Sequence, residues 1–314
     1  MRLALAVLAL VVAAPAPTLP GAKAFRSCAA AGPYWPTQTL ALSGGFAWVA
    51  CKEEQRILRV PLQPGRSRSI PVSGQPIAVV SAFGAVWALE GGGTISRIDP
   101  RTARITARLQ TGASAAYNLW AGAGSLWSVD DSVGEVIRID PNKRDVTERI
   151  PVGDGAADLV FRGERVWVIN HRDRGLVQMD AATNRPRRLT TVPGDAPERM
   201  AWAAGSLWVT GRGTDLLRLD PETGAVQATI EIGVGGIDLV AAAGALWVPA
   251  RAAAADRRGF PTMTWLRRAD PATGKVTTLL RTSRRIDVHG LVPYRRGVLF
   301  ADNTGGSLYA VPAS

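Results

Sequence analysis

Histidine and cysteine, the side chains that most often ligate transition metals or act as nucleophiles, are scarce in this sequence. Only His171, His289, Cys28 and Cys51 occur in 314 residues. No Cys/His metal spacing, nucleophile motif or glycine-rich phosphate loop is present. The enzyme and metal-site classes that depend on those motifs are therefore not indicated.

Long hydrophobic runs are also missing after the first residues. Residues 1–24 have the pattern of a secretory signal peptide, with a basic start at Arg2, an apolar stretch Leu3–Ala14 and a small-x-small cleavage site at 22–24. No later run approaches about 18 apolar residues, so we expect no transmembrane helix. The sequence predicts a monomeric periplasmic or secreted protein whose folded part spans residues 25–314.

Acidic residues are too few to balance the basic ones. The sequence has 37 Lys and Arg against 26 Asp and Glu, for a formal charge of +11, which falls to +9 when the leader takes Arg2 and Lys23 with it. The arginines are spread along the chain and no nucleic-acid motif accompanies them. We therefore expect no nucleic-acid partner, and a basic balance that serves solubility or contact with an anionic envelope.

Tryptophan, in contrast, is abundant and periodic. Six of the ten stand in similar contexts, and the segment GVLF near the C-terminus puts Phe300 in the seventh place, with intervals of 39, 40, 40, 41, 39 and 53 residues: Trp48, Trp87, Trp127, Trp167, Trp208, Trp247, Phe300. A fixed period of about 40 residues with four short strands per unit is typical of a β-propeller blade. The sequence predicts an all-β, seven-bladed β-propeller with four-stranded antiparallel blades.

The unit 205–233 shows how each blade is built. Trp208 stands in a short apolar run expected to be the second strand, where the large ring fills the wedge between neighbouring sheets. Asp220-Pro221 follows between the third and fourth strands, with Gly224 at a left-handed position, which is turn chemistry. Both features are predicted to be structural.

Closure of the ring requires the two ends of the chain to meet. The last repeat has three strands before the chain stops, so its outer strand is expected from residues 25–31, because an open edge would be a pairing hazard. A disulfide between Cys28 and Cys51 would tie this borrowed strand to the second strand of blade 1. The alternative is two unpaired thiols.

Candidate ligand-binding residues lie on the face formed by the loops between blades and the loops after each second strand. Glu90, Asp130, Asn170 and Asn303 stand three residues beyond the repeated aromatic residue, Arg199 lies on a loop between blades, and Arg257 and Arg258 lie in an insertion of about ten residues in blade 6. Glu90 and Asp130 carry oxygen ligands suited to Mg²⁺ or Ca²⁺. Asp and Asn are also common in tight turns, so these residues have a structural alternative. The insertion in blade 6 has one too, as a surface loop without a binding role.

The repeat, Gly-x-Leu-Trp-Val followed by Arg-Ile-Asp-Pro-x-Thr-Gly and Ile-x-Val-Gly, resembles exported bacterial propellers of the YVTN type and the streptogramin lyase (virginiamycin B lyase) family. The resemblance covers all seven blades. Those lyases are metal-dependent enzymes that open a cyclic depsipeptide by elimination, using a His on one loop between blades and a Glu-x-His on the next. The resemblance implies Asp287 and His289 as catalytic candidates, while Gly236 stands at the place of the first His.

The functional hypothesis is an exported propeller that binds a small molecule or a protein partner on its loop face, similar to a streptogramin lyase but with an incomplete catalytic set. The alternative is a Mg²⁺- or Ca²⁺-dependent carbon–oxygen lyase or lactonase-like hydrolase at the central channel. A purely structural scaffold is the third possibility. No cofactor is assigned beyond that metal.

Overall fold

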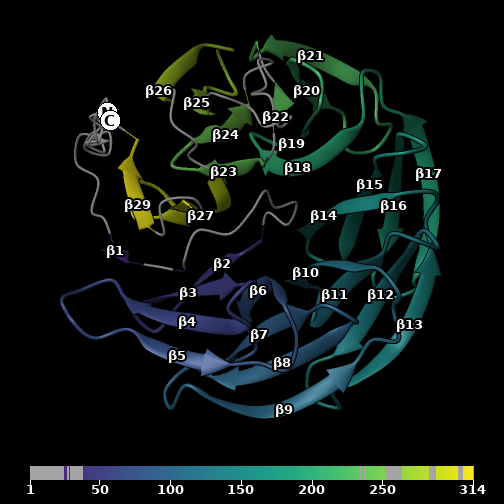
Figure 1. The fold of residues 1–314 in the computed structure, drawn as a ribbon. Helices are drawn as coiled ribbons and strands as arrows, with labels where there is room; N and C mark the ends of the chain where they lie inside the picture. The colour runs from purple at the N-terminus through teal and green to yellow at the C-terminus, as the bar shows by residue number, and fades with distance from the viewer. Residues whose placement is uncertain are drawn as a thin grey trace, which may run out of the picture.

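Seven antiparallel β-sheets form a ring around a central channel in the computed structural model (Figure 1). The structure describes residues 25–26, 28, 38–233, 235–236, 238–251, 264–282, 288–302 and 307–313. The predicted seven-bladed β-propeller is confirmed. Among these residues no helix has the length and apolarity needed to cross a bilayer.

The strands follow the chain blade by blade, each blade running from the channel outward. Blade 1 is β2 (Leu40–Ser43), β3 (Phe46–Cys51), β4 (Arg56–Pro61) and β5 (Arg68–Pro71). Blade 2 is β6 (Pro76–Ala82), β7 (Ala85–Glu90), β8 (Thr94–Asp99) and β9 (Arg104–Gln110). Blade 3 is β10 (Ala116–Gly122), β11 (Ser125–Asp130), β12 (Glu135–Asp140) and β13 (Asp145–Pro151). Blade 4 is β14 (Ala156–Arg162), β15 (Arg165–Asn170), β16 (Gly175–Asp180) and β17 (Arg185–Thr191). Blade 5 is β18 (Pro197–Ala203), β19 (Ser206–Gly211), β20 (Asp215–Leu219) and β21 (Val226–Glu231). Blade 6 is β22 (Gly235–Gly236) and β23 (Val240–Ala242), which both pair with β24 (Ala245–Arg251), then β25 (Thr264–Ala269) and β26 (Val276–Thr282). Blade 7 is β27 (Val288–Tyr294), β28 (Gly297–Asp302) and β29 (Ser307–Pro312), completed by β1 (Phe25–Arg26).

The repeated tryptophans fill the wedges between blades, as predicted. Trp208 packs with Leu246 and Val248 of the next blade, and Trp127 packs with Val166 and Val168 in the same way. All six rings are at most 1% exposed. Because each ring closes the space between two sheets, one side chain per repeat connects neighbouring blades.

Blade 7 departs from the sequence prediction by one residue. Val292 of β27 pairs with Leu299, as Val160 pairs with Trp167 in blade 4. Leu299 packs against Ala47 of blade 1, whereas Phe300 packs back against Trp247. The assignment of Phe300 to the tryptophan place is therefore wrong. The reason is the hairpin, in which Gly297 is already a strand residue, while the matching Gly205 belongs to the turn.

The aspartate turns between the third and fourth strands have the predicted geometry. The Oδ1 of Asp220 accepts hydrogen bonds from the backbone N–H groups of Glu222 and Thr223, both at 2.9 Å. Gly224 then takes a left-handed conformation, with φ of 74°. Matching turns begin at Asp99, Asp140, Asp180 and Asp270. At Asp180 no proline follows, so the carboxylate is the part of the motif that all five turns share.

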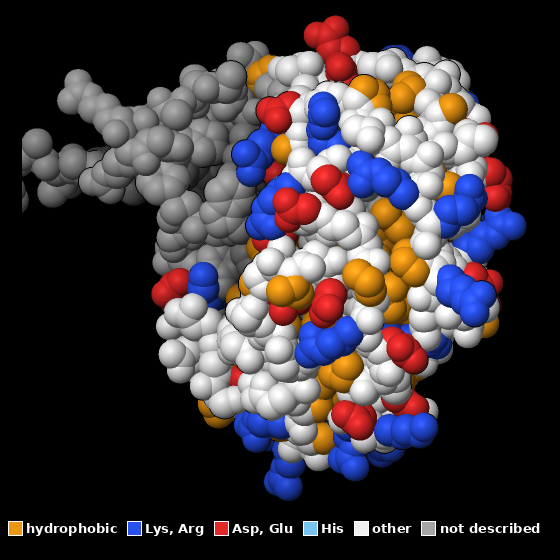
Figure 2. Space-filling model, turned by 90° about the vertical axis from the view of Figure 1, so that its right-hand side faces the viewer, with side chains coloured by type: hydrophobic (Ala, Val, Ile, Leu, Met, Phe, Trp, Pro, Cys, Tyr) orange, Lys and Arg blue, Asp and Glu red, His pale blue; other side chains and the backbone are white. Residues whose placement is uncertain are grey.

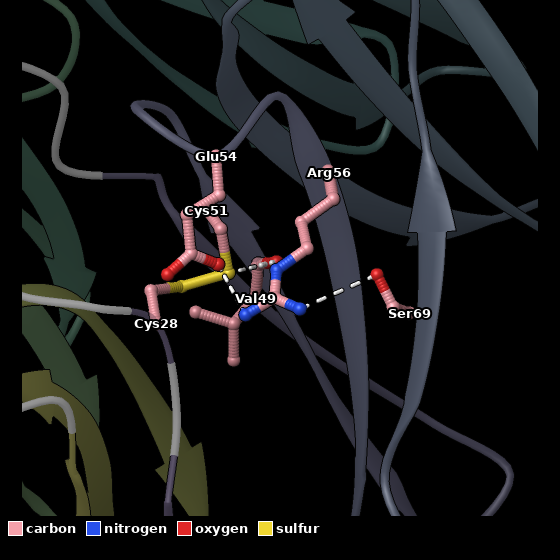
Figure 3. The surroundings of a disulfide bond; sticks show 6 residues. All are labelled: Cys28, Val49, Cys51, Glu54, Arg56 and Ser69. Atoms are coloured by element: carbon pink, nitrogen blue, oxygen red, sulfur yellow. Dashed lines mark hydrogen bonds and ion pairs between the residues drawn. A yellow bond between two sulfur atoms is a disulfide. The ribbon is translucent and has the colours of Figure 1, made fainter.

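The N-terminus closes the ring, as predicted. Phe25 and Arg26 of β1 pair with Leu308 and Ser307 of β29. A disulfide joins Cys28, just after this strand, to Cys51 at the end of β3 (Figure 3). The last sheet is therefore completed by the first strand, and a covalent bond connects that strand to blade 1.

Basic side chains are scattered over the outside of the ring. Figure 2 shows Lys and Arg interleaved with Asp and Glu on the side that carries β13 and β17, with no continuous basic stripe on this face. Several of these arginines stack on the repeated aromatic rings, such as Arg138 over Trp127 at 5.1 Å. On this side the excess of positive charge is therefore spread through the repeat rather than gathered in one patch.

Candidate functional site

A small pocket lies on the loop face between blades 3, 4 and 5. Its volume is about 250 Å³. The first residues of the inner strands form its floor, and the loops after β11, β15 and β19 form its rim. The lining residues are Tyr117, Asp131, Ala156, Ala157, His171, Glu198, Arg199 and Arg212.

Ion pairs organise the rim of this pocket. Asp131 accepts a hydrogen bond from Arg172 and lies 3.1 Å from Nε2 of His171. Arg172 Nη1 also donates to Asp154 Oδ1 at 3.0 Å, and this bond raises the pKa of Arg172. Because Arg172 is 43% exposed, such pairs contribute little to stability. Their effect is to hold the rim in one arrangement.

Arg199 forms the buried end of the pocket and is only 4% exposed. Its Nη1 donates to the carbonyl oxygen of Glu198 at 2.7 Å, whereas Nε has no hydrogen-bond partner among the described residues. Burial lowers the pKa of the guanidinium, but the negative charges of Asp158 and Asp238 outweigh this effect, so the pKa is raised. Arg199 is therefore a fixed buried cation. Glu198 directs its own carboxylate to Arg212, with Oε1 3.0 Å from Nε.

Two buried carboxylates connect neighbouring inner strands around the channel. Asp158 Oδ2 accepts a hydrogen bond from the N–H of Met200 in the next blade at 2.7 Å. Asp238 Oδ2 accepts one from the N–H of Leu291 at 3.3 Å. Both donors belong to innermost strands, β18 and β27, in which every second N–H points away from the neighbouring strand and toward the channel. The carboxylates satisfy these donors, which would otherwise be unpaired.

A larger cavity of about 610 Å³ lies in the channel on the other side of Arg199. Its walls are mainly apolar residues of the inner strands, including Leu40, Val79 and Leu119. Asp158, Arg199 and Asp238 also line it. Arg199 lines both cavities and therefore stands between the loop-face pocket and the channel cavity.

Comparison with known proteins finds neither a matching family model nor a similar curated protein. Among solved structures, a chain of the mitotic checkpoint complex is 14% identical, with a TM-score of 0.74 and coverage of 99% of this chain and 100% of that one. Virginiamycin B lyase from Staphylococcus aureus is 14% identical, with a TM-score of 0.72 and coverage of 92% and 97%. A chain of the complex of BBS1N with ARL6DN is 14% identical, with a TM-score of 0.69 and coverage of 91% and 94%. The likeness is one of fold. For this propeller, residue roles have to come from its own geometry.

Two predicted metal ligands of the propeller, Glu90 and Asp130, are buried at the ends of β7 and β11. Glu90 Oε2 accepts hydrogen bonds from Ser73 Oγ and Gly74 N–H, each at 2.7 Å. Asp130 Oδ2 accepts one from the N–H of Ser114 at 3.0 Å. Burial raises the pKa of Asp130, but the hydrogen bonds from Ser132 and Ser114 outweigh it and lower the pKa. Each carboxylate holds the loops of its own blade, and neither lines the two cavities.

Asn170 has a similar place at the end of β15, where its Nδ2 donates to the carbonyl oxygen of Val152 at 2.8 Å. Across the described part of the chain, no group of three or more His, Cys, Asp or Glu side chains is placed to hold a metal ion. Of the predicted ligand-binding residues, the structure brings Arg199 to a cavity.

The register of blade 7 changes which residue of this blade corresponds to Glu90 and Asp130, while the predicted ligand-binding role of Asn303 stays a prediction. Asp302, rather than Asn303, ends β28 and corresponds to Glu90 and Asp130, because Leu299 takes the tryptophan place. Asn303 lies outside the described residues, as do Asp287, Arg257 and Arg258. The backbone of His289 pairs with Ala301 within β27 and β28. The predicted roles of Asp287 and His289 stay predictions.

Sequence reasoning missed Tyr117, Asp131, His171 and Arg212 as a set, because loops of three blades bring them together. A signal for the channel carboxylates was present. Asp158 and Asp238 each stand nine residues before the tryptophan of their repeat, in Asp-Leu-Val segments. Arg199 stands nine residues before Trp208 and so has the same position in blade 5. A polar residue at an inner-strand position that faces the channel is a candidate for function as well as for structure.

The burial of Asp158 predicts an unusual dependence of stability on pH. Burial raises the pKa of this carboxyl from 3.8 to about 6, although the charge of Arg199 opposes the shift. Between these values the folded state binds a proton that the unfolded state releases. The free energy of unfolding is therefore expected to rise, by about 2 to 3 kcal/mol, as pH falls from about 7 to about 4.5. Urea unfolding across this range measures the effect.

The same experiment has two internal controls. Below about pH 4 the trend should reverse, because backbone N–H groups lower the pKa of the turn residues Asp99 and Asp220, and protonating them destabilises the fold. Asp158→Asn should flatten the profile between pH 5 and 7, whereas Asp154→Asn on the exposed rim should leave it unchanged. Stability that rises steadily from pH 5 to 8 in the unsubstituted protein would contradict the assignment.

Proposed function

We propose that this protein is exported and binds a protein partner across its loop face, with an acidic side chain of the partner entering the pocket between blades 3, 4 and 5. The observation that carries the proposal is the buried cation at the end of an open, preformed pocket. Arg199 has an Nε without a hydrogen-bond partner among the described residues. Arg212 stands at the rim with its side chain 56% exposed. An acidic group in the pocket would therefore meet two guanidinium groups.

The size and composition of the pocket favour a protein over a whole small molecule. Its volume of about 250 Å³ is below the roughly 300–1,000 Å³ of typical small-molecule sites. Tyrosine and arginine, which line it, are the residue types that often dominate the energy of protein interfaces. The ion pairs of Asp131 and Glu198 fix the rim before binding, so less side-chain entropy is lost on association.

The fold neighbours are compatible with such a role. Two of the solved structures with this fold are assemblies, the mitotic checkpoint complex and the complex of BBS1N with ARL6DN. Since the sequences are 14% identical, the similarity is one of fold. It shows that propellers of this shape occur in protein complexes, and the argument for a partner here rests on the pocket itself. The proposed export rests on the signal-peptide pattern of residues 1–24.

Site-specific photo-crosslinking in the producing cell tests the proposal. A photoreactive residue at position 154, on the rim, should give a discrete crosslinked species, whereas the same residue at position 226, on the exposed outer strand β21, should not. Arg212→Glu should remove the species and weaken binding of the purified partner at least tenfold, because it places a negative charge at the pocket mouth. Arg101→Glu, in a turn between third and fourth strands, is the matched control.

Crosslinking that is equal at positions 154 and 226, or unaffected by Arg212→Glu, would contradict the proposal. An enzymatic role would also replace it. The fold likeness to virginiamycin B lyase motivates this second candidate, a Mg²⁺- or Ca²⁺-dependent lyase or lactonase-like hydrolase. Metal-dependent turnover of ester or lactone substrates, lost in an Asp287→Ala, His289→Ala double variant, would support it.

A further inference from the structure

Two guanidinium groups lie together on the outer half of blade 1. Arg59 of β4 and Arg68 of β5 are directly opposite each other in the antiparallel sheet, so their side chains extend from the same face. Arg59 Nη1 donates to the carbonyl oxygen of Arg101 at 3.4 Å. Arg68 Nη1 donates to the carbonyl oxygen of Thr102 at 2.7 Å. Both cations are therefore held against one turn of blade 2, the turn that joins β8 to β9 (Figure 1).

Such a pair of like charges does not occur at this position in blades 2 to 6. There, the third-strand residue opposite the repeated tryptophan and its partner on the fourth strand include at most one cation: Arg97 and Ala107, Arg138 and Glu148, Gln178 and Arg187, Arg218 and Ala228, Arg268 and Thr277. Like charges directly opposite each other in a sheet are destabilising. Blade 1 therefore carries an unfavourable pair that the repeat does not require.

No carboxylate balances this pair within the part of the chain that the structure describes. There, the hydrogen bonds of Arg59 and Arg68 go to the two turn carbonyls, and neither side chain forms an ion pair. Asp99 belongs to the same turn, but its Oδ1 accepts hydrogen bonds from the backbone N–H groups of Arg101 and Thr102 at 2.8 and 3.0 Å. Burial and then the charge of Arg68 lower the pKa of Arg59. The two cations therefore repel each other.

The rest of the sequence offers few acidic residues that could approach this pair. Residues 1–37, which precede blade 1, contain no Asp or Glu. The acidic residues outside the described ranges are Asp256, between β24 and β25, and Asp287, directly before β27. Both belong to blades 6 and 7, whereas Arg59 and Arg68 are held against blade 2.

The chemistry of the pair suits a phosphate group. Guanidinium groups bind phosphate through parallel N–H···O bonds, and each of the two has N–H groups left after its bond to the turn. A phosphate monoester carries nearly two negative charges near neutral pH, which match two cations. Arg59 also lies over the ring of Phe46, with Cζ 3.6 Å from the ring centroid. Because this contact fixes the guanidinium before binding, less side-chain entropy is lost when an anion binds.

We infer that Arg59 and Arg68 form a binding site for a phosphate group on the outer half of blade 1, at its junction with blade 2. The site is separate from the loop-face pocket, which lies between blades 3, 4 and 5. It therefore does not depend on the proposed protein partner. Soluble phosphate esters and lipid headgroups share this chemistry, so the experiments include both sources.

Titration of the purified protein with inorganic phosphate, in chloride buffer of constant ionic strength, tests the site. Phosphate should raise the melting temperature by at least about 2 °C. Arg68→Ala should lower the affinity measured by calorimetry at least tenfold. Arg187→Ala is the matched control, because Arg187 has the same place in β17 but stands opposite the neutral Gln178, and it should keep the affinity. Absence of phosphate binding, or an equal loss in the two variants, would overturn the inference.

The melting temperature in chloride alone separates binding from a purely structural role of Arg68. Arg68→Glu places a carboxylate opposite Arg59, as Glu148 stands opposite Arg138 in blade 3. It should raise the melting temperature in chloride, because it replaces repulsion by attraction, and it should remove the response to phosphate. A melting temperature below that of the unsubstituted protein in chloride would assign Arg68 to holding the turn and would contradict the inference.

Vesicle co-sedimentation identifies the source of the phosphate. If the group belongs to a lipid, phosphatidylcholine vesicles that contain phosphatidic acid should bind the unsubstituted protein and Arg187→Ala equally, and Arg68→Ala more weakly. Phosphate binding in calorimetry without this difference on vesicles would assign the site to a soluble phosphate ester. Equal behaviour of all three proteins in both assays would refute the site.

Discussion

Replacing Trp127 by alanine is expected to lower the free energy of unfolding by about 3 to 5 kcal/mol. The indole ring is fully buried between blades 3 and 4, and Val166 and Val168 belong to the same core cluster. Its Nε1 also donates to the carbonyl oxygen of Gly122 at 2.8 Å. The backbone of two sheets surrounds the space, so the cavity can collapse only partly.

Chemical denaturation followed by far-ultraviolet circular dichroism measures this loss. Val133→Ala in the same blade is a suitable control, because Val133 is 61% exposed and should change stability by less than about 0.5 kcal/mol. A loss below about 1 kcal/mol in Trp127→Ala would mean that the ring does not carry the contact between blades 3 and 4.

Replacing Arg199 by methionine is expected to cost about 3 to 5 kcal/mol near neutral pH. The methionine fills a similar volume but leaves Asp158 and Asp238 without the buried cation whose charge they share. The cost should become smaller toward pH 5, because Asp158 then takes up a proton and its charge disappears. Urea unfolding of Arg199→Met at pH 7.5 and pH 5 measures both effects.

A double-mutant cycle separates charge from packing. Adding Asp158→Asn to Arg199→Met should recover part of the loss, since it removes the carboxylate charge that interacts most strongly with Arg199. Arg212→Met is the matched control: its guanidinium pairs with Glu198 at the exposed rim and should contribute less than about 1 kcal/mol. An Arg199→Met loss that is the same at both pH values and unaffected by Asp158→Asn would assign the role of Arg199 to packing.

The fold was predictable because its determinants are local and repeated. The alternation that places Trp208 in a second strand, and the Asp220 turn with Gly224 at a left-handed position, lie within one unit of about 40 residues. The one-residue error at Phe300 arose where this local signal is weakest. Arg296 stands at the place of Gly205 in the hairpin turn, and only the pairing of β27 with β28 fixes the register.

The site was less predictable because it depends on contacts between blades. Asp130 and Glu90 have the residue types of metal ligands. In the folded protein, however, their carboxylate oxygens accept hydrogen bonds from Ser114 and Ser73, which lie in loops before the innermost strands of the same blades. Arg199 was predicted to lie on a loop between blades, whereas the structure places it in β18, the innermost strand of blade 5. Its neighbours in the pocket, such as Asp131 and His171, come from loops of two other blades.

The sequence by itself determined the number of blades, the residue types that fill the wedges, and the closure of the last sheet by β1, since these follow from a period, from strand and turn chemistry, and from a missing fourth strand. Only the tertiary structure decided which carboxylates are saturated and which face a cavity. That choice depends on which N–H groups of the loops and of the innermost strands lie beside each carboxylate. The N–H of Leu119, for example, donates a hydrogen bond to Oε1 of Gln38, which is 81 residues away in the chain. Such donors and acceptors meet only when the ring is closed.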